Sequence, residues 1–127
     1  GAKLKVRERL MTDGSQQAFT DFVVELDGDG SGCDLISRSV AKDQSHQEFR
    51  SMIRGNRPCT GHSECDAIIM GHGTVNAAPE LAANHEDAAL IHEAAIGKIA
   101  GEQILKLCTL GLTEEQAEAK IVEGFLR

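Results

Sequence analysis

The chain is poor in aromatic residues: it has no Trp, no Tyr and only four Phe among its 127 residues. Hydrophobic residues still make up 41% of it, so a core of aliphatic and small side chains can form in a single domain of ordinary size. The sequence also lacks any apolar run near the roughly 20 residues that cross a bilayer. We therefore expect no association with a membrane through a spanning segment.

Clustered positive charge is missing as well. The net charge is −7 and no stripe of Lys and Arg is present, which argues against binding to nucleic acid phosphates. The sequence contains neither a phosphate-binding loop nor the spaced glycines of a dinucleotide site, and no Ser has an identifiable catalytic partner. We expect no ATP hydrolysis and no enzymatic activity from this chain itself.

Cysteine is present without the pattern of a disulfide framework. The spacing of the four cysteines is not that of a small secreted scaffold, and we expect a reducing, cytoplasmic setting. These residues are Cys33, Cys59, Cys65 and Cys108.

Short segments separated by Gly, Asn and Asp make up the first three quarters of the chain. They recur roughly every 11 to 17 residues, which is typical of consecutive β-strands. Alternation places Phe22, Val24 and Leu26 on one face of their strand. A β-sandwich and a β-solenoid both fit this pattern. The expected strands are Leu4–Met11, Phe19–Leu26, Cys33–Ala41, His46–Ile53, His62–Met70 and the weaker Asp87–His92.

The last part of the chain has a helical pattern. Apolar residues recur at three- and four-residue spacing, and Gly111 is placed to end a first helix. Thr113 and Gln116 have the spacing of a capping box, which predicts the start of a second helix. We expect residues 1–96 to form the β-structure and residues 97–127 to form a helical hairpin.

Asp27–Gly32 resembles the first half of an EF-hand calcium loop, with its alternating oxygens and final Gly. The position of the bidentate Glu is occupied by Arg38, and the flanks are patterned as strands where helices are required. We interpret this segment as a turn between strands.

The run from Cys59 to Cys65, with His72 nearby, offers soft ligands for zinc. In an extended strand these two cysteines would lie about 20 Å apart, at ~3.3 Å per residue. Only a turn at Gly61 would bring them together. A zinc-binding Cys/His module is therefore one alternative for this chain.

Two separated segments carry a resemblance to a known family. In Gly61–Gly71, Cys65 is followed by Asp66 and an apolar run. A second match begins at His92–Leu105 and continues through Leu110–Ala119 to Phe125 and Leu126. Together and in this order they resemble the C-terminal part of the SufB/SufD family of iron–sulfur cluster assembly proteins. Members of that family are considerably longer, so the chain resembles the C-terminal piece of one.

The resemblance implies a fold and a function. The fold is a mainly β, right-handed parallel β-helix segment with a C-terminal helical hairpin. The function is that of a scaffold component in an iron–sulfur cluster assembly complex, acting with a SufC-like ABC-type ATPase that docks on the C-terminal part. A second SufB/SufD-like subunit would complete a homodimer or heterodimer, which also agrees with the exposed end that a solenoid fragment presents.

The resemblance also implies a site. Cys65 would be a thiolate ligand or sulfur acceptor for a transient cluster at a subunit interface, with His92 and Glu93 as further ligands from a neighbouring subunit. Without the resemblance, Cys65 is a small buried thiol, His92 a histidine at a helix entry and Glu93 a solvated carboxylate in a first helical turn. A structural interaction module of solenoid type, without ligand chemistry, is the corresponding alternative.

Overall fold

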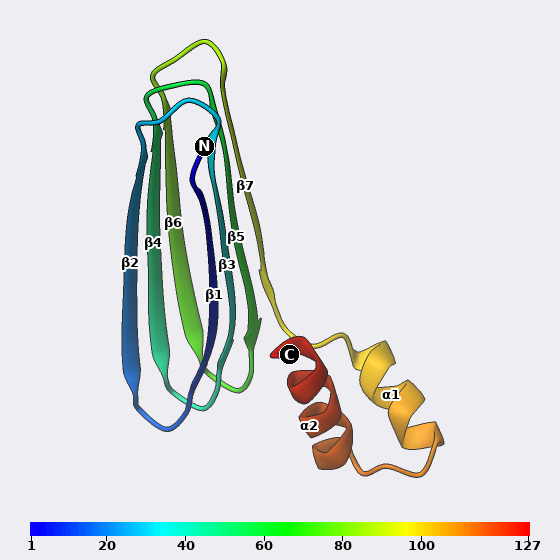
Figure 1. Cartoon of the computed structure of the whole chain (residues 1–127). Coiled ribbons are helices and arrows are strands. Elements are labelled where there is room, and N and C mark those ends of the chain that lie inside the picture. The colour runs from blue at the N-terminus through cyan, green and yellow to red at the C-terminus, as the bar shows by residue number, and fades with distance from the viewer.

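The computed structural model describes residues 1–127 as a parallel β-solenoid followed by two helices (Figure 1). Each coil contributes one strand to each of two facing sheets, one ordered β1-β3-β5-β7 and the other β2-β4-β6. All neighbouring strands are parallel. The expected solenoid with a C-terminal helical pair is thereby confirmed. The strands are β1 (Lys3–Thr12), β2 (Gln17–Leu26), β3 (Ser31–Ala41), β4 (His46–Gly55), β5 (Cys59–Ile69), β6 (Thr74–Ala83) and β7 (Ala88–Gly97).

Stacking of equivalent positions organises the molecule. Val6, Leu35, Ser63 and His92 occupy one row across the first sheet. Three coils are complete, and β7 begins a fourth that has no strand in the second sheet. Strand β7 is therefore paired with β5 on one side, and no strand of the second sheet lies opposite it.

The interior between the two sheets is narrow and partly polar. One end is apolar, with Leu35 and Ile53 fully buried and the Phe22 and Phe49 rings edge to face at 6.0 Å. Between Phe49 and Ile53 on β4, the Ser51 hydroxyl forms a buried hydrogen bond of 3.1 Å with the Ser63 hydroxyl. No buried side-chain polar atom lacks a partner. Small hydroxyl side chains therefore occupy the interior volume that aromatic side chains fill in wider cores.

The sequence pattern located six of the seven strands and missed β6. This strand is rich in Ala and contains Pro79, two features with low strand propensity. The structure places β6 at the edge of its sheet, where a proline is tolerated because one side of the strand needs no ladder hydrogen bonds. The last strand is also longer than expected and extends to Gly97. His92 and Glu93 consequently lie within β7, and their assignment to a helix entry is wrong.

The chain ends in helices α1 (Gly101–Thr109) and α2 (Glu114–Phe125). The predicted capping box between Thr113 and Gln116 is present, and Gly111, at φ 96°, follows the end of α1 as expected. Neither helix is long and apolar enough to span a membrane.

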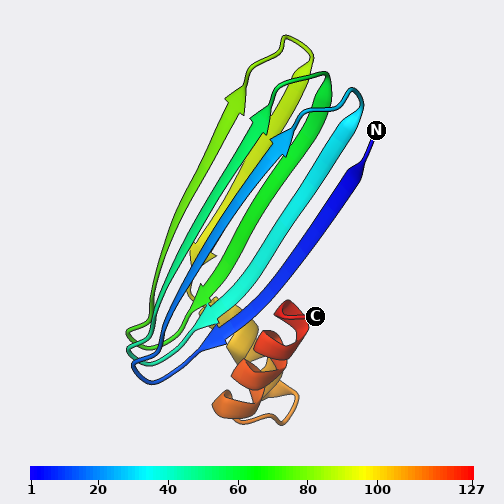
Figure 2. The same cartoon turned by 60° about the vertical axis from the view of Figure 1, so that its left-hand side comes forward.

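Helix α2 lies against the outer face of the first sheet, near the ends of β1 and β3 (Figure 2). The Arg38 guanidinium is 6.0 Å from the centre of the Phe125 ring, and Arg9 Nε donates to the Arg127 carbonyl at 3.3 Å. Ala117 and Val122 are the buried residues of the helix. The helix is thereby fixed to the solenoid through both apolar and polar contacts.

A close approach at the turn after β5 yields a stability prediction. A Cβ at Gly73 would lie 2.3 Å from the Ala41 carbonyl oxygen, whereas one at Gly97 would meet nothing within 4 Å. We expect Gly73→Ala to lower the free energy of unfolding by about 1–3 kcal/mol, because backbone has to shift. Gly97→Ala should leave the thermal midpoint nearly unchanged. Equal midpoints for the two variants would contradict this packing.

Candidate functional site

The candidate residues lie on β5 and β7, which are neighbours in the first sheet. Along β5 the residues alternate strictly, so that Cys65 faces the interior while His62 and Glu64 face outward. The same alternation in β7 separates His92 from Glu93. The two strands therefore carry two distinct groups of side chains, one on each face of the sheet.

Cys65 forms the centre of the interior group. It is 2% exposed and lies between Ser37 on β3 and Ala94 on β7. Glu8 occupies the same row on β1, where its carboxylate accepts hydrogen bonds from Ser37 Oγ at 2.7 Å and Thr20 Oγ1 at 2.8 Å. A row of polar side chains thus leads along the interior to the thiol.

Burial raises the pKa of the Cys65 thiol to about 11, and the negative charges of Asp66 and Glu8 add to the effect. At neutral pH the group is a thiol. In this state it is a weak nucleophile and a poor metal ligand, because both roles require the thiolate.

His92 shares the interior face with Cys65. It pairs with Ser63, whereas Cys65 pairs with Ala94, so the two side chains lie in rows two residues apart on adjacent strands. His92 is exposed, since no strand of the second sheet lies opposite β7. The imidazole therefore lies at the open end of the solenoid, beside the coil that holds the thiol.

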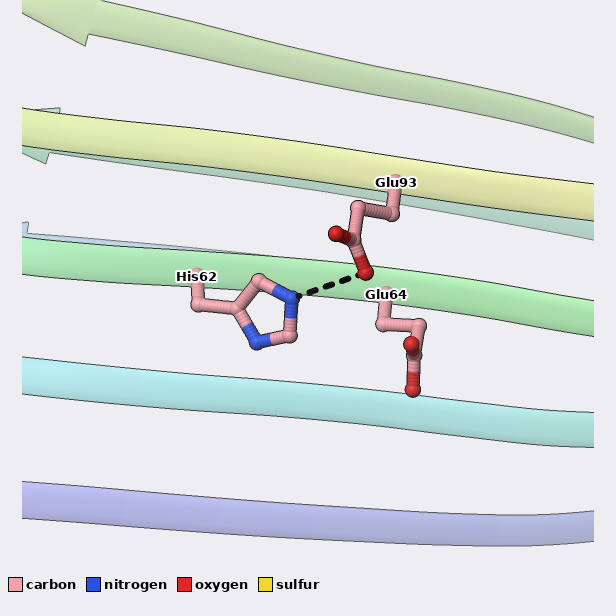
Figure 3. A group of neighbouring side chains, drawn as sticks. All are labelled: His62, Glu64 and Glu93. Atoms are coloured by element: carbon pink, nitrogen blue, oxygen red, sulfur yellow. Dashed lines mark hydrogen bonds and ion pairs between the residues drawn. The ribbon is translucent and has the colours of Figure 1, made fainter.

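Glu93 belongs to the outer group and not to the face of Cys65. Ligand atoms of His62, Glu64 and Glu93 all lie within 4.8 Å of one another (Figure 3). His62 Nε2 is 3.5 Å from a Glu93 carboxylate oxygen, and His62 Nδ1 is 2.7 Å from Asp34 Oδ1. Within one chain, the expected set of Cys65, His92 and Glu93 is divided between the two faces of the sheet.

The charges of the outer group influence one another. The hydrogen bond to Asp34 raises the pKa of His62, and Glu93 adds to the increase. Partial burial raises the pKa of Glu64, with further contributions from Asp66 and Glu93. No Lys or Arg forms an ion pair with Glu64 or Glu93. Glu93 therefore forms an ion pair with His62 alone, and Glu64 forms none.

His62 and Glu64 were not predicted from the sequence as a pair of ligands. The available signal was their spacing, since residues i and i+2 of a strand share a face. The third member, Glu93, lies one coil later, and its position beside Glu64 depends on the exact register of β5 with β7. That register cannot be read from the spacing of apolar residues alone.

The two metal-like motifs have clear positions in the structure. Asp27–Gly32 links β2 to β3 as the expected turn, where Asp27 accepts a hydrogen bond from Asn56 and Asp29 forms an ion pair with Arg57. Cys59 and Cys65 lie in the single extended strand β5, without the turn at Gly61 that a shared zinc ion requires.

The burial pattern of the cysteines predicts their order of alkylation. Cys108 in α1 is half-buried, whereas Cys33, Cys59 and Cys65 are buried. With a pKa of about 11, roughly one Cys65 in a thousand is a thiolate at pH 8. In the folded protein we expect iodoacetamide to modify Cys108 first, as measured by peptide mass spectrometry against time. Labelling of Cys65 as fast as Cys108 would be incompatible with the interior placement.

Comparisons with known proteins agree with this architecture. Residues 1–125 match the SufBD core domain of the SUF system for iron–sulfur cluster assembly. An iron–sulfur cluster assembly SufBD family protein of Methanothermobacter thermautotrophicus is 41% identical over 105 residues, which cover 81% of this chain and 26% of the relative. Another such protein, from Pyrococcus horikoshii, is 33% identical over 132 residues, covering 98% of this chain and 40% of the relative. The chain thus spans less than half the length of these relatives, and it belongs to the SufBD family of iron–sulfur cluster assembly proteins.

Proposed function

We propose that this chain is part of a scaffold on which an iron–sulfur cluster is assembled, with Cys65 as thiolate ligand or sulfur acceptor. The observation that carries the proposal is the placement of Cys65 and His92 on the same face of adjacent strands, beside the open end of the solenoid. Membership of the SufBD family supports the link to iron–sulfur chemistry. In this role the chain binds and positions the cluster's components and catalyses no reaction of its own.

Binding of ferrous iron to Cys65 must displace a proton. The sulfur forms a bond to iron as the S–H bond is lost, and the proton leaves to solvent, which makes binding dependent on pH. The raised pKa of the thiol opposes this step, and the charge of the metal ion provides the driving force. His92 supplies a second ligand when its imidazole is neutral.

A second SufB/SufD-like subunit would complete the site. One Cys and one His do not fill the four ligand positions of an iron–sulfur cluster. The open end exposes the edge of β7, including Ile91 at 58% and Ile96 at 40% exposure, and an unpaired strand edge favours pairing with another chain. We infer a homodimer or heterodimer with the cluster shared across its interface and Glu93 as a further candidate ligand.

The helical hairpin is the part that we assign to a SufC-like ABC-type ATPase. Helix α1 has no buried residue, and Leu105 and Leu110 are 66% and 79% exposed. A partner that covered Leu105 and the C-cap residue Leu110 would gain free energy from the burial of their apolar surface. The four free cysteines fit a reducing, cytoplasmic setting for such a complex.

The second candidate function is a structural interaction module without ligand chemistry. The burial of Cys65 favours it, because an inaccessible thiol is also what a simple core position requires. Reconstitution experiments separate the two candidates.

Anaerobic reconstitution with ferrous iron and sulfide tests the ligands. We expect Cys65→Ser and His92→Ala each to abolish the visible absorption of a bound cluster, because each removes a donor atom. Cys108→Ser, on α1, is the matched thiol control and should reconstitute like the parent. Circular dichroism checks that all variants fold. Cluster formation at the parental level in both ligand variants would leave the interaction module as the function.

Light scattering tests the assembly. The chain has a mass of 13.6 kDa, and we expect twice this mass at concentrations of about tens of micromolar, where weak dimers form. Ile91→Lys should shift the protein to monomer, because a charge beside the β7 edge opposes pairing. Val23→Lys, at an equally exposed position on β2, serves as the control. A parent that is monomeric under these conditions would rule out dimerisation through this edge.

A further inference from the structure

We propose that His62, Glu64 and Glu93 form a binding site for a divalent transition-metal cation on the outer face of the first sheet, with Asp34 as the positioning residue. The site is separated from Cys65 by the strand β5 itself, because residues 62 and 64 face away from the interior. It requires no thiol. The site therefore lies apart from Cys65 and His92, and Glu93 is the one residue that it shares with the candidate cluster ligands.

The backbone places the three ligands together. His62 and Glu64 are neighbours on one face of β5, and Glu93 is the register partner of Glu64 on β7. Their ligand atoms lie within 4.8 Å of one another. Around a bound first-row metal ion such atoms lie about 3 to 3.5 Å apart, given metal–ligand distances near 2.1 Å. Rotations of the exposed Glu93 side chain and the half-buried Glu64 side chain would have to cover the difference.

The orientation of the imidazole is that of a metal ligand. Asp34 Oδ1 lies 2.7 Å from Nδ1 and accepts a hydrogen bond from it, which leaves Nε2 as the atom that faces Glu93 (Figure 3). Metal-binding histidines commonly have their second nitrogen held by a carboxylate in this way. Asp34 lies in the same row as His62 on β3, so this contact too is a product of the register.

The negative charges of Glu64 and Glu93 favour the binding of a cation. Glu64 and Glu93 have no Lys or Arg partner, and Asp66 lies on the same face. A divalent cation between the Glu64 and Glu93 carboxylates would neutralise negative charge that no Lys or Arg side chain pairs with.

The types of donor atom restrict which cations the site can bind. One imidazole nitrogen and two carboxylates suit Fe²⁺, Mn²⁺, Co²⁺ or Zn²⁺, whereas Cu⁺ prefers sulfur and Ca²⁺ prefers oxygen ligands alone. Three protein ligands leave coordination positions open to water. The site therefore has the composition of an exchangeable site and not of a closed structural one.

A second His-x-Glu pair in the chain provides a matched control. His46 Nε2 lies 3.2 Å from Glu48 on the outer face of β4, but its Nδ1 faces the Thr74 hydroxyl at 2.6 Å. No further carboxylate joins this pair to make a three-ligand group. The His46/Glu48 and His62/Glu64 pairs thus have the same spacing in the sequence. They differ in the residues that surround them.

The test is titration of the untagged full chain with Co²⁺, followed by calorimetry and visible absorption. We expect one saturable site whose spectrum lacks a thiolate-to-cobalt charge-transfer band. Asp34→Asn should weaken binding roughly 10-fold or more, which is the usual effect of losing a carboxylate behind a histidine ligand. The double variant Glu64→Gln, Glu93→Gln should weaken it at least as much.

The controls separate this site from the thiol and from nonspecific binding. The double variant His46→Gln, Glu48→Gln and the single variant Cys108→Ser should both bind Co²⁺ like the parent. The proposal would be overturned if the parent showed no saturable binding of Co²⁺. It would also be overturned if the His46→Gln, Glu48→Gln variant lost as much affinity for Co²⁺ as the variants of Asp34, Glu64 and Glu93. A charge-transfer band that disappears in Cys65→Ser would assign the metal to the thiol instead and would leave the cluster scaffold in place.

Discussion

The register of parallel strands in the first sheet is the constraint on which the other features of this molecule depend. It stacks Asp34 beside His62, Glu64 beside Glu93 and Ser37 beside Cys65. A slip of β7 by one residue would turn Glu93 to the interior and His92 to the outside, because alternate residues of a strand face opposite sides. Both candidate sites would then lose a member. Their geometry is therefore a property of coil stacking and not of any local motif.

Several interactions fix that register outside the candidate sites. At one end, Asn56 donates a hydrogen bond to Asp27 and Asn84 donates one to Asn56, each at 2.7 Å, so that equivalent turns of successive coils are linked. At the other end, Asp43 accepts from the backbone N–H of Gly14 at 2.9 Å. In the interior, paired hydroxyls do the same between sheets. Polar contacts of defined geometry specify a position along the strand, which apolar contacts between small side chains do less strictly.

The parts of the fold that were predictable from sequence are those with local causes. Alternation in residues 21–26 correctly placed Phe22, Val24 and Leu26 inward, and the capping box at Thr113 located α2. Strand β6 was missed because its edge position tolerates the Ala and Pro residues that its composition disfavours. The outer group of His62, Glu64 and Glu93 was missed for a different reason, since its members come from successive coils and meet only through the register. Resemblance to the SufB/SufD family supplied the fold choice that periodicity left open.

The two faces of β5 differ in their electrostatic environment. On the outer face, carboxylates near a histidine remain in contact with water, so a cation can bind and leave without any change in the fold. On the inner face, burial is the largest cause of the raised pKa of Cys65, and the charges of Asp66 and Glu8 are secondary. Neutralising those charges would therefore leave the largest cause of the raised pKa in place. Only a change in the surroundings of the sulfur, through a bound metal ion or an opening of the solenoid end beside His92, replaces the solvation that burial removes. Access to the open end is thus the step on which the proposed role of Cys65 depends.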